Sequence, residues 1–237
     1  MENLLSKTID LKLDWATHEA AKYACEKWHY SKSVPVPPLV KVGVWESEIY
    51  IGCVLFSRGA TQNLVKPYGL KQTEGCELTR IALKSHAAPV SRIMSLAIKF
   101  LKKSNPKLRL IVSFADPNQG HYGGIYQATN WIYTGKTPPS VEYLDYRGNR
   151  WHGRQVSKAG VKVQFGSARK TPKIADCEKI YCDGKHRYLY PLDKSIKKRV
   201  QALSKPYPKR AGSKDSVASC DQQGEGGANP TPALQNQ

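Results

Sequence analysis

The sequence contains no long hydrophobic run. A helix that crosses a bilayer needs about 18 or more consecutive apolar residues, and no such run occurs among these 237 residues. Residues 1–10 also lack the basic-then-apolar order of a secretory signal. We therefore expect a cytoplasmic protein with no membrane partner.

Paired cysteine motifs are missing as well. The six cysteines are scattered, and none forms a Cys-x-x-Cys pair. In a reducing compartment this usage indicates free thiols rather than a disulfide framework. Cys177, Cys182 and His186 are grouped, but their spacing departs from zinc fingers and lacks a clear fourth ligand. Ordinary thiols are the favoured interpretation.

Acidic residues are scarce, with 19 Asp and Glu against 37 Lys and Arg, for a net charge of +18. The excess is concentrated between Arg147 and Arg210, where 18 basic residues face 4 acidic ones and aromatic residues are interleaved. This mixture is typical of phosphate contacts and base stacking, so we expect a polyanionic partner. The alternative is a cationic surface that only confers solubility.

The segment 76–135 has the pattern of an α/β ligand-binding domain. It predicts a strand at 76–83, a helix from Val90 after Pro89, a strand at 108–114, a short helix that carries Tyr126 and a strand at 131–135. We expect a mixed central sheet flanked by helices, of the α+β or α/β class. Asp116, Asn118, Gln119, His121 and Tyr122 follow the second strand. Ligand sites lie beyond such strand ends, although an ordinary solvated loop is the alternative.

The flanking segments extend this sheet. Residues 40–45 and 49–56 indicate a hairpin, and 141–151 indicate a second strand pair. Residues 15–28 have helical spacing, with Asp14 as the expected N-cap. We expect one catalytic domain over residues 1–200, with its basic part at 147–200. Residues 201–237 lose their apolar content, which predicts a disordered tail.

The order of these elements resembles the GCN5-related N-acetyltransferase fold. The string IYQATNWIYTG at Ile125 is similar to the tyrosine-to-glycine ending of that family. The resemblance implies an acyl-CoA-type donor and a general-acid role for Tyr126 toward a departing thiolate; a half-buried tyrosine with a satisfied hydroxyl is the alternative. The family's glycine-rich phosphate loop is replaced by Ala-Pro-Val-Ser-Arg at 88–92, which weakens the case for coenzyme A.

Six strings are similar to the phage Mom family: CEKWHY, VGVWE, GCELTRIAL, PVSRI, LRLIVSFADP and HYGGIYQATNWIYTG. They cover roughly residues 25–190. That family adds an acetamido (methylcarbamoyl) group to the exocyclic amine of adenine in phage DNA and blocks host restriction endonucleases. The resemblance implies catalytic roles for Ser91, Asp116 and Tyr126. It implies donor binding by Glu77, Arg80, Ser91 and Arg92, and action in the host cytoplasm.

The chemistry implied by this resemblance leaves two routes open. In the product, the adenine nitrogen bonds a CH₂ that carries the carboxamide, which simple aminolysis of a thioester does not give. Either a methyl carbon is activated, which suggests a redox metal such as iron, or the donor already contains a glycine-like unit. His29, Tyr30 and His121 are weak candidate ligands. Asp116 is placed to orient or deprotonate the poorly basic adenine amine, or only to cap its loop.

Reaching a base amine in double-stranded DNA requires groove distortion or base flipping, with backbone contacts and an aromatic surface. We expect the DNA-facing side chains to be Arg150, Trp151, His152, Arg154, Lys185, His186, Arg187 and Tyr188. Two other functions stay open. One is an acyl-CoA-dependent N-acetyltransferase that acts on a small molecule, a protein or RNA. The other is a nonenzymatic basic DNA-binding protein.

Overall fold

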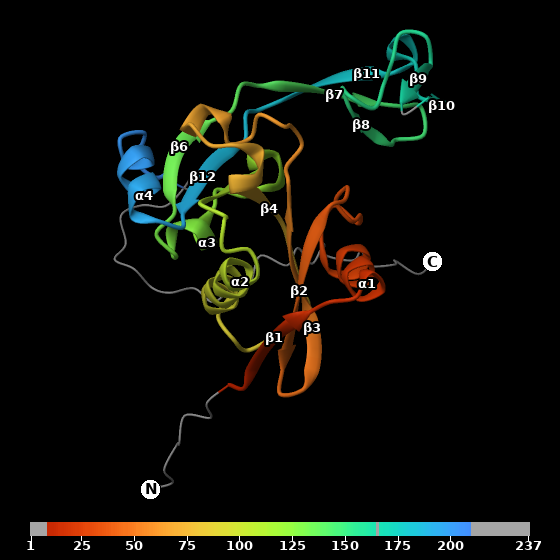
Figure 1. The fold of residues 1–237 in the computed structure, drawn as a ribbon. Helices are drawn as coiled ribbons and strands as arrows, with labels where there is room; N and C mark the ends of the chain where they lie inside the picture. The colour runs from red at the N-terminus through yellow and green to blue at the C-terminus, as the bar shows by residue number, and fades with distance from the viewer. Residues whose placement is uncertain (1–8, 165, 210–237) are drawn as a thin grey trace, which may run out of the picture. The chain divides into compact units, whose positions relative to one another are not determined.

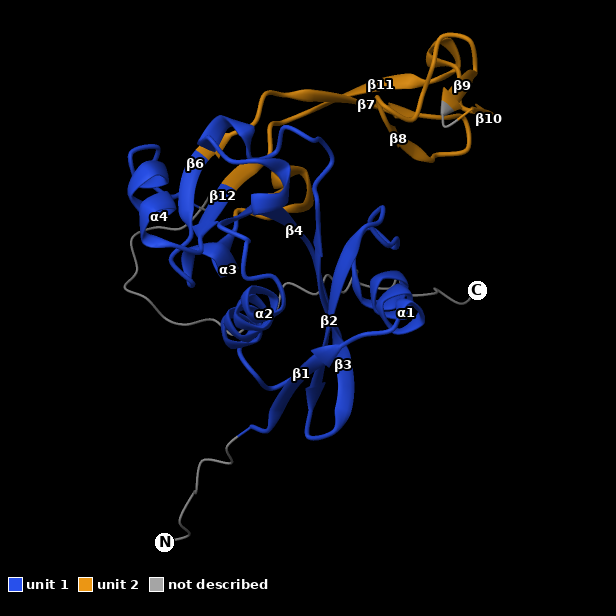
Figure 2. Cartoon of the chain, in the orientation of Figure 1, with its two compact units in different colours: residues 1–114, 123–134, 188–237 blue, residues 115–122, 135–187 orange. Residues whose placement is uncertain are grey.

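The computed structural model describes residues 9–164 and 166–209 (Figure 1). These residues form two compact units, which we describe separately (Figure 2). The first unit combines 1–114, 123–134 and 188–237, and the second combines 115–122 and 135–187, within the described ranges. That the units work as the one catalytic domain expected for residues 1–200 stays a prediction.

A seven-stranded sheet organises the first unit, in the order β1-β2-β3-β4-β5-β12-β6. The strands from β1 to β4 pair antiparallel, whereas β4 and β5 pair parallel. Their bounds are Leu11–Trp15 (β1), Leu39–Glu46 (β2), Ile49–Ser57 (β3), Gly75–Leu83 (β4), Leu110–Ala115 (β5), Ile132–Lys136 (β6) and His186–Pro191 (β12). The predicted class, a mixed central sheet flanked by helices, is confirmed.

Helix α1 (His18–Trp28) begins one turn later than its spacing predicts. Thr17 is the N-cap and accepts a hydrogen bond from the amide of Ala20 at 3.1 Å. The predicted cap, Asp14, was wrong because residues 11–15 pair with β2 as strand β1. The helix buries Ala21, Ala24 and Cys25 against Cys53, Leu55 and Ala82 of β3 and β4.

Helix α2 (Val90–Ser104) confirms the predicted amphipathic helix after Pro89, which occupies the N-cap. Its apolar side chains at 93, 94, 97, 98 and 101 are buried, and Phe100 packs edge-on against Trp15 of β1 with ring centroids 5.0 Å apart. The two helices lie on opposite sides of the β1–β3 strands (Figure 1). Together they bury both faces of that part of the sheet.

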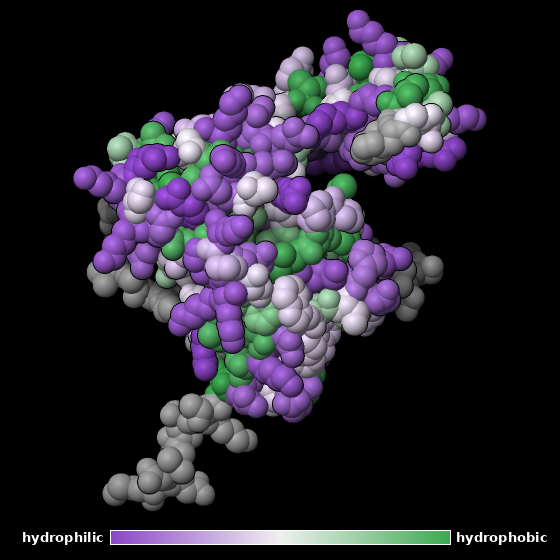
Figure 3. Space-filling model, in the orientation of Figure 1, coloured by the Kyte–Doolittle hydropathy of each residue, from purple (hydrophilic) through white to green (hydrophobic). Residues whose placement is uncertain are grey.

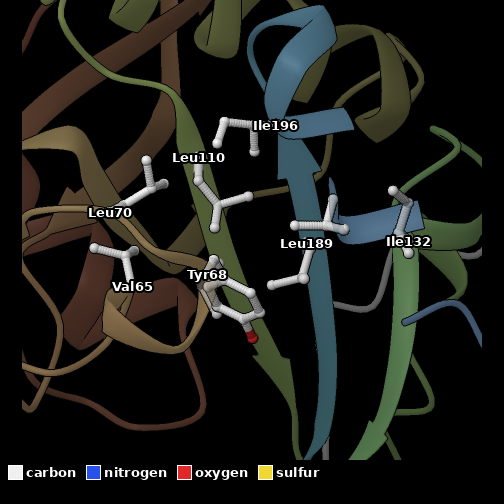
Figure 4. Close-up of a cluster of buried hydrophobic side chains, with 9 residues drawn as sticks. Val65, Tyr68, Leu70, Leu110, Ile132, Leu189 and Ile196 are labelled. Atoms are coloured by element: carbon white, nitrogen blue, oxygen red, sulfur yellow. The ribbon is translucent and has the colours of Figure 1, made fainter. Parts of the chain in front are cut away.

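A second apolar cluster fixes the other half of the sheet (Figure 4). It joins β5, β12 and β6 to the 3₁₀ helix Lys66–Tyr68 and to α4 (Lys194–Gln201). Asp193 caps α4 by accepting from the amide of Ile196 at 2.9 Å, and it pairs with Arg109 at 2.8 Å. The buried members of this apolar cluster are Val65, Tyr68, Leu70, Leu110, Val112, Ile132, Leu189, Ile196 and Val200.

The second unit contains a three-stranded sheet in the order β11-β7-β8 and a two-stranded hairpin, β10-β9. Their bounds are Ser140–Leu144 (β7), Arg150–His152 (β8), Val161–Gln164 (β9), Ser167–Lys170 (β10) and Glu178–Cys182 (β11). The predicted strand pair at 141–151 is confirmed as β7 and β8, whose register pairs Tyr143 with Trp151. Hydrophilic side chains cover much of the face in Figure 3, in keeping with the net charge.

Two further predictions concern the chain's ends and membranes. Of the predicted disordered tail, 210–237 lie outside the described residues. Tyr207, which precedes them, donates a hydrogen bond to the carbonyl of Trp131 at 2.7 Å. No helix in the described part of the chain is long and apolar enough to cross a membrane.

Candidate functional site

The parallel strands β4 and β5 pair over a short stretch and then part. Their register runs from Gly75 opposite Leu110 to Leu78 opposite Ser113. Beyond Leu78, β4 continues to Leu83 paired with β3, and no described strand pairs with its other edge. A strand edge of this kind presents backbone N–H and C=O groups that an extended ligand can pair with.

A chain of hydrogen bonds lies where the two strands part. The Ser113 hydroxyl is 2.8 Å from the carbonyl of Leu78 and 2.8 Å from the Tyr126 hydroxyl. A hydroxyl carries a single hydrogen and a carbonyl can only accept, so all partners are satisfied when Ser113 donates to Leu78 and accepts from Tyr126. Ser113 is 1% exposed. It therefore fixes the position of the Tyr126 hydroxyl.

Aromatic rings hold Tyr126 in place. Tyr126 lies on the four-residue helix α3 (Gly124–Gln127), and its ring packs 5.0 Å from those of Trp131 and Tyr188. Tyr188 is fully buried, and burial raises the pKa of its hydroxyl to about 12. Its expected place in the DNA-facing set is therefore not supported, because the side chain supports Tyr126 in the core instead.

Gly123 gives the Tyr188 ring its space. A Cβ there would lie 2.4 Å from the ring, and the backbone φ of +84° already favours glycine. We expect Gly123→Ala to lower the free energy of unfolding by about 1–3 kcal/mol, as overpacking does, more than Gly120→Ala. Gly120 has a similar φ of +71° with open space around it. Urea unfolding measures the free energy of unfolding of both variants. Equal decreases would show that the cost comes from backbone strain alone and not from the clash with the Tyr188 ring.

The predicted donor-binding residues at the start of α2 face solvent. Ser91 is half-buried and Arg92 is exposed, and neither side chain bonds another described residue. The preceding loop amides of Ala87 and Ala88 donate to the carboxylate of Glu46 at 2.9 and 2.7 Å. Besides lacking glycine, this loop thus already holds an anion. A phosphate-bearing donor would have only Ser91, Arg92 and the first-turn amides for its charge.

Glu77 and Arg80 lie on β4, as predicted. Arg80 donates to the carbonyl of Thr79 at 2.7 Å, while its buried Nε has no hydrogen-bond partner among the described residues. The register between β3 and β4 shifts at Thr79, which is paired with no residue of β3. Its hydroxyl donates to the carbonyl of Leu55 at 3.1 Å. Arg80 therefore offers an unused donor next to the diverging strands.

Asp116 follows β5 and belongs to the second unit, whereas Tyr126 belongs to the first. One carboxylate oxygen accepts from the backbone and side-chain nitrogens of Asn118, each at 3.0 Å, and the other pairs with Lys185 at 2.7 Å. Burial acts to raise the pKa of Asp116, but Lys185 and Asn118 outweigh it and hold that pKa below its usual value. Asp116 is ionised at neutral pH.

Lys185→Ala is expected to raise the pKa of Asp116, because the stabilising ammonium is removed while burial stays. The carboxylate then becomes protonated at higher pH than in the native chain. Carbon NMR titration of the Asp116 carboxyl measures the shift. Lys185→Arg keeps the charge and serves as the control. An unchanged titration in Lys185→Ala would contradict the role given to the ion pair.

The predicted DNA-facing residues fall into exposed and buried groups. Arg150, His152 and Arg154 are exposed, and Trp151 and Arg187 are half-buried. Arg150 pairs loosely with Glu142 at 3.6 Å, and Lys185 pairs with Asp116. His186 is 3% exposed, so it does not present a ring at the surface. DNA contact by the exposed members stays a prediction.

The candidate metal ligands are divided between the units. His29 and Tyr30 stack in the first, with ring centroids 4.3 Å apart, and the His29 Nδ1 lies 2.8 Å from the Ser31 hydroxyl. His121 lies in the second. Within residues 9–164 and 166–209, no three His, Cys, Asp or Glu side chains are grouped as a metal site.

Ser113 is a member of this candidate site that the sequence analysis missed. Its signal is a single hydroxyl within the apolar strand Leu-Ile-Val-Ser-Phe-Ala at 110–115. Its partners, however, come from a different strand and a different helix.

Comparison with known proteins connects the whole described region to one family. The Methylcarbamoylase mom of Escherichia phage Mu is 23% identical over 210 residues, covering 84% of each chain. Similar solved structures include a putative acetyltransferase from Acinetobacter baylyi, 10% identical with a TM-score of 0.43 over 79% of this chain and 94% of that one. A Bacillus subtilis acetyltransferase in complex with CoA is 13% identical, with a TM-score of 0.43 over 78% and 99%. The model of the Mom protein family matches residues 10–209, and this chain therefore belongs to the Mom protein family.

Proposed function

We propose that this protein is a DNA-modifying transferase that adds an acetamido (methylcarbamoyl) group to the exocyclic amine of adenine in phage DNA. The family match over residues 10–209 is the observation that carries the proposal. The relative's name supports the transferred group, and the basic region after Arg147 supports a DNA substrate. The modification would protect the DNA from host restriction endonucleases in the cytoplasm.

Tyr126 is the proposed proton donor. A new bond joins the adenine nitrogen to a methylene carbon of the donor, and the group that leaves that carbon must gain a proton or keep a negative charge. The Tyr126 hydroxyl, whose oxygen lies 2.8 Å from that of Ser113, supplies that proton by turning its single hydrogen from Ser113 to the leaving group, and the proton lost by the adenine nitrogen passes to solvent. Ser113 in turn rests on the Leu78 carbonyl, so the phenol is oriented before the substrate arrives.

Asp116 is proposed to act on the adenine amine. The lone pair of that amine is delocalised, so the nitrogen needs help to lose its proton. A carboxylate whose pKa lies below its usual value is a weak base, so orienting the amine by accepting its hydrogen bond suits Asp116 better than full proton abstraction. Asp116 therefore positions the nucleophile.

The proposed donor is an acyl-CoA-type small molecule that already contains a glycine-like unit, a CH₂ bonded to a carboxamide, and that carries its leaving group on this CH₂. An extended arm with amide groups can pair with the open edge of β4 beyond Leu78. Arg80 offers its unused Nε there, and Ser91 and Arg92 offer a hydroxyl and a guanidinium at the positive end of α2. In the loop before α2, the Glu46 carboxylate already accepts from the amides of Ala87 and Ala88, and its negative charge would repel a phosphate. No step of the proposed reaction passes through a metal.

Resistance of DNA to restriction tests this proposal and separates it from both alternatives. DNA from cells that express the native chain is expected to resist endonucleases whose sites contain adenine, and DNA from cells with Tyr126→Phe to be cut. If the DNA resisted cleavage only while the protein was present and was cut after the protein had been removed, the chain would act as a nonenzymatic DNA-binding protein. If purified chain acetylated a protein, RNA or small molecule with acetyl-CoA while DNA stayed sensitive, it would be an N-acetyltransferase with another substrate.

A further inference from the structure

A basic cavity of about 220 Å³ lies in the second unit, between β8 and the β9–β10 hairpin. Its lining includes Arg154, Lys162, Arg169 and Lys170, together with the indole of Trp151. No acidic residue lines it. Four cations in one concave surface favour an anionic occupant.

The hairpin places two of these cations directly opposite each other. Arg169 of β10 pairs in register with Lys162 of β9, and like charges at such positions destabilise a hairpin. None of the ion pairs in the described part of the chain involves either residue. The Lys162 ammonium donates to the backbone carbonyl of Arg154, which is neutral. A bound anion would relieve the repulsion.

Trp151 forms the other wall, and its ring is fixed. The indole N–H donates to the Asp145 carboxylate at 2.8 Å. Hydrogen bonds from Asn149, and then from Trp151 and nearby amides, outweigh burial and lower the pKa of Asp145 to about 2. That carboxylate is held by its own turn and does not line the cavity. A fixed aromatic ring beside cations suits a base or sugar attached to a phosphate.

We propose that this cavity binds one phosphate group of a DNA strand, with the Trp151 ring against the sugar or base of that nucleotide. Pockets for drug-sized ligands are about 300–1,000 Å³, so this one is large enough for a phosphate and part of a nucleotide but too small for a whole CoA-type donor. The inference rests on the proposed function for the identity of the strand. It adds the β9–β10 hairpin to the DNA-binding surface and gives Lys162 and Arg169 a role.

Arg169→Ala tests the cavity with little structural risk, since this side chain bonds no other described residue. The matched control is Lys179→Ala, which removes the same charge from an exposed position on β11 outside the cavity. Binding of the full chain to a short double-stranded oligonucleotide is measured over a range of salt concentrations. Arg169→Ala is expected to weaken binding roughly fivefold near physiological salt and to reduce the slope of log K against log salt by about 1.

Trp151→Leu is the second variant, and it is expected to weaken binding about fivefold or more with the slope unchanged, since the ring carries no charge. Arg169→Ala could reduce the slope of log K against log salt while the native chain leaves DNA unmodified. That result would support the phosphate site in the cavity and would contradict the proposed reaction. If the native chain modifies DNA but Arg169→Ala and Lys179→Ala bind alike, the cavity assignment is overturned. Tighter binding of duplex RNA with the same Arg169 dependence would overturn DNA as its ligand.

Discussion

Tyr126→Phe is expected to reduce the rate of DNA modification by about 10²- to 10⁴-fold, the usual contribution of a positioned acid. The variant keeps the ring that packs against Trp131 and Tyr188 and removes the hydroxyl that bonds Ser113. Ser113 can still donate to the carbonyl of Leu78. The fold should survive, and the loss should appear in the rate constant for transfer measured with purified protein, donor and DNA.

Two matched variants show whether the hydroxyl itself matters. Tyr50→Phe removes another hydroxyl of the first unit, one that donates to the carbonyl of Ala20 at 3.1 Å away from α3. It should leave the rate unchanged. Ser113→Ala keeps the Tyr126 hydroxyl but releases it, so we expect an intermediate loss. Equal rates for Tyr126→Phe and Tyr50→Phe would remove Tyr126 from the mechanism.

Asp116→Asn is expected to lower the rate by about 10²-fold, near the lower end for groups that act on a proton. The amide keeps an oxygen toward Asn118, but it can no longer attract the adenine amine or Lys185 with a full charge. The native rate should fall as the pH drops through the lowered pKa of Asp116, because protonation removes the acceptor. That acid limb should be absent from the variant's pH profile.

Asp183→Asn is the control for this change. Asp183 is an exposed carboxylate of the same unit that pairs with Lys136 at 3.3 Å. Its loss alters the net charge in the same direction but should leave both the rate and the acid limb as in the native chain. A variant of Asp116 that kept the native rate and acid limb would reduce this residue to a loop cap.

The sequence predicted elements well where periodicity was strong. Helix α2 and strands β2, β3, β4 and β5 lie within a few residues of their predicted bounds. Strand β1 was missed because its last two residues, Asp14 and Trp15, were assigned to the cap and the first position of the helix, and no strand was predicted before them. Strand β12 was missed because the charge around it suggested a DNA surface, although Tyr188 and Leu189 are fully buried.

The candidate site was only partly predictable. Asp116 was found because a polar loop follows a buried strand, and Tyr126 was found because its string is similar to that of the acetyltransferase and Mom families. Their partners depend on pairing between distant segments: Ser113 meets Leu78 through the β4–β5 register, and Lys185 reaches Asp116 from a late loop. Glu46, whose carboxylate binds the loop before α2, is the last residue of strand β2. No local pattern reports such contacts.

The central claim is the chemical change made to adenine, and mass spectrometry of digested DNA tests it most directly. DNA from cells that express the native chain is compared with DNA from cells that express Tyr126→Phe. We expect an adenine nucleoside heavier by the acetamido group in the first sample and a strong reduction in the second. An adenine nucleoside of unchanged mass in DNA from cells that make the native, folded chain would contradict the account.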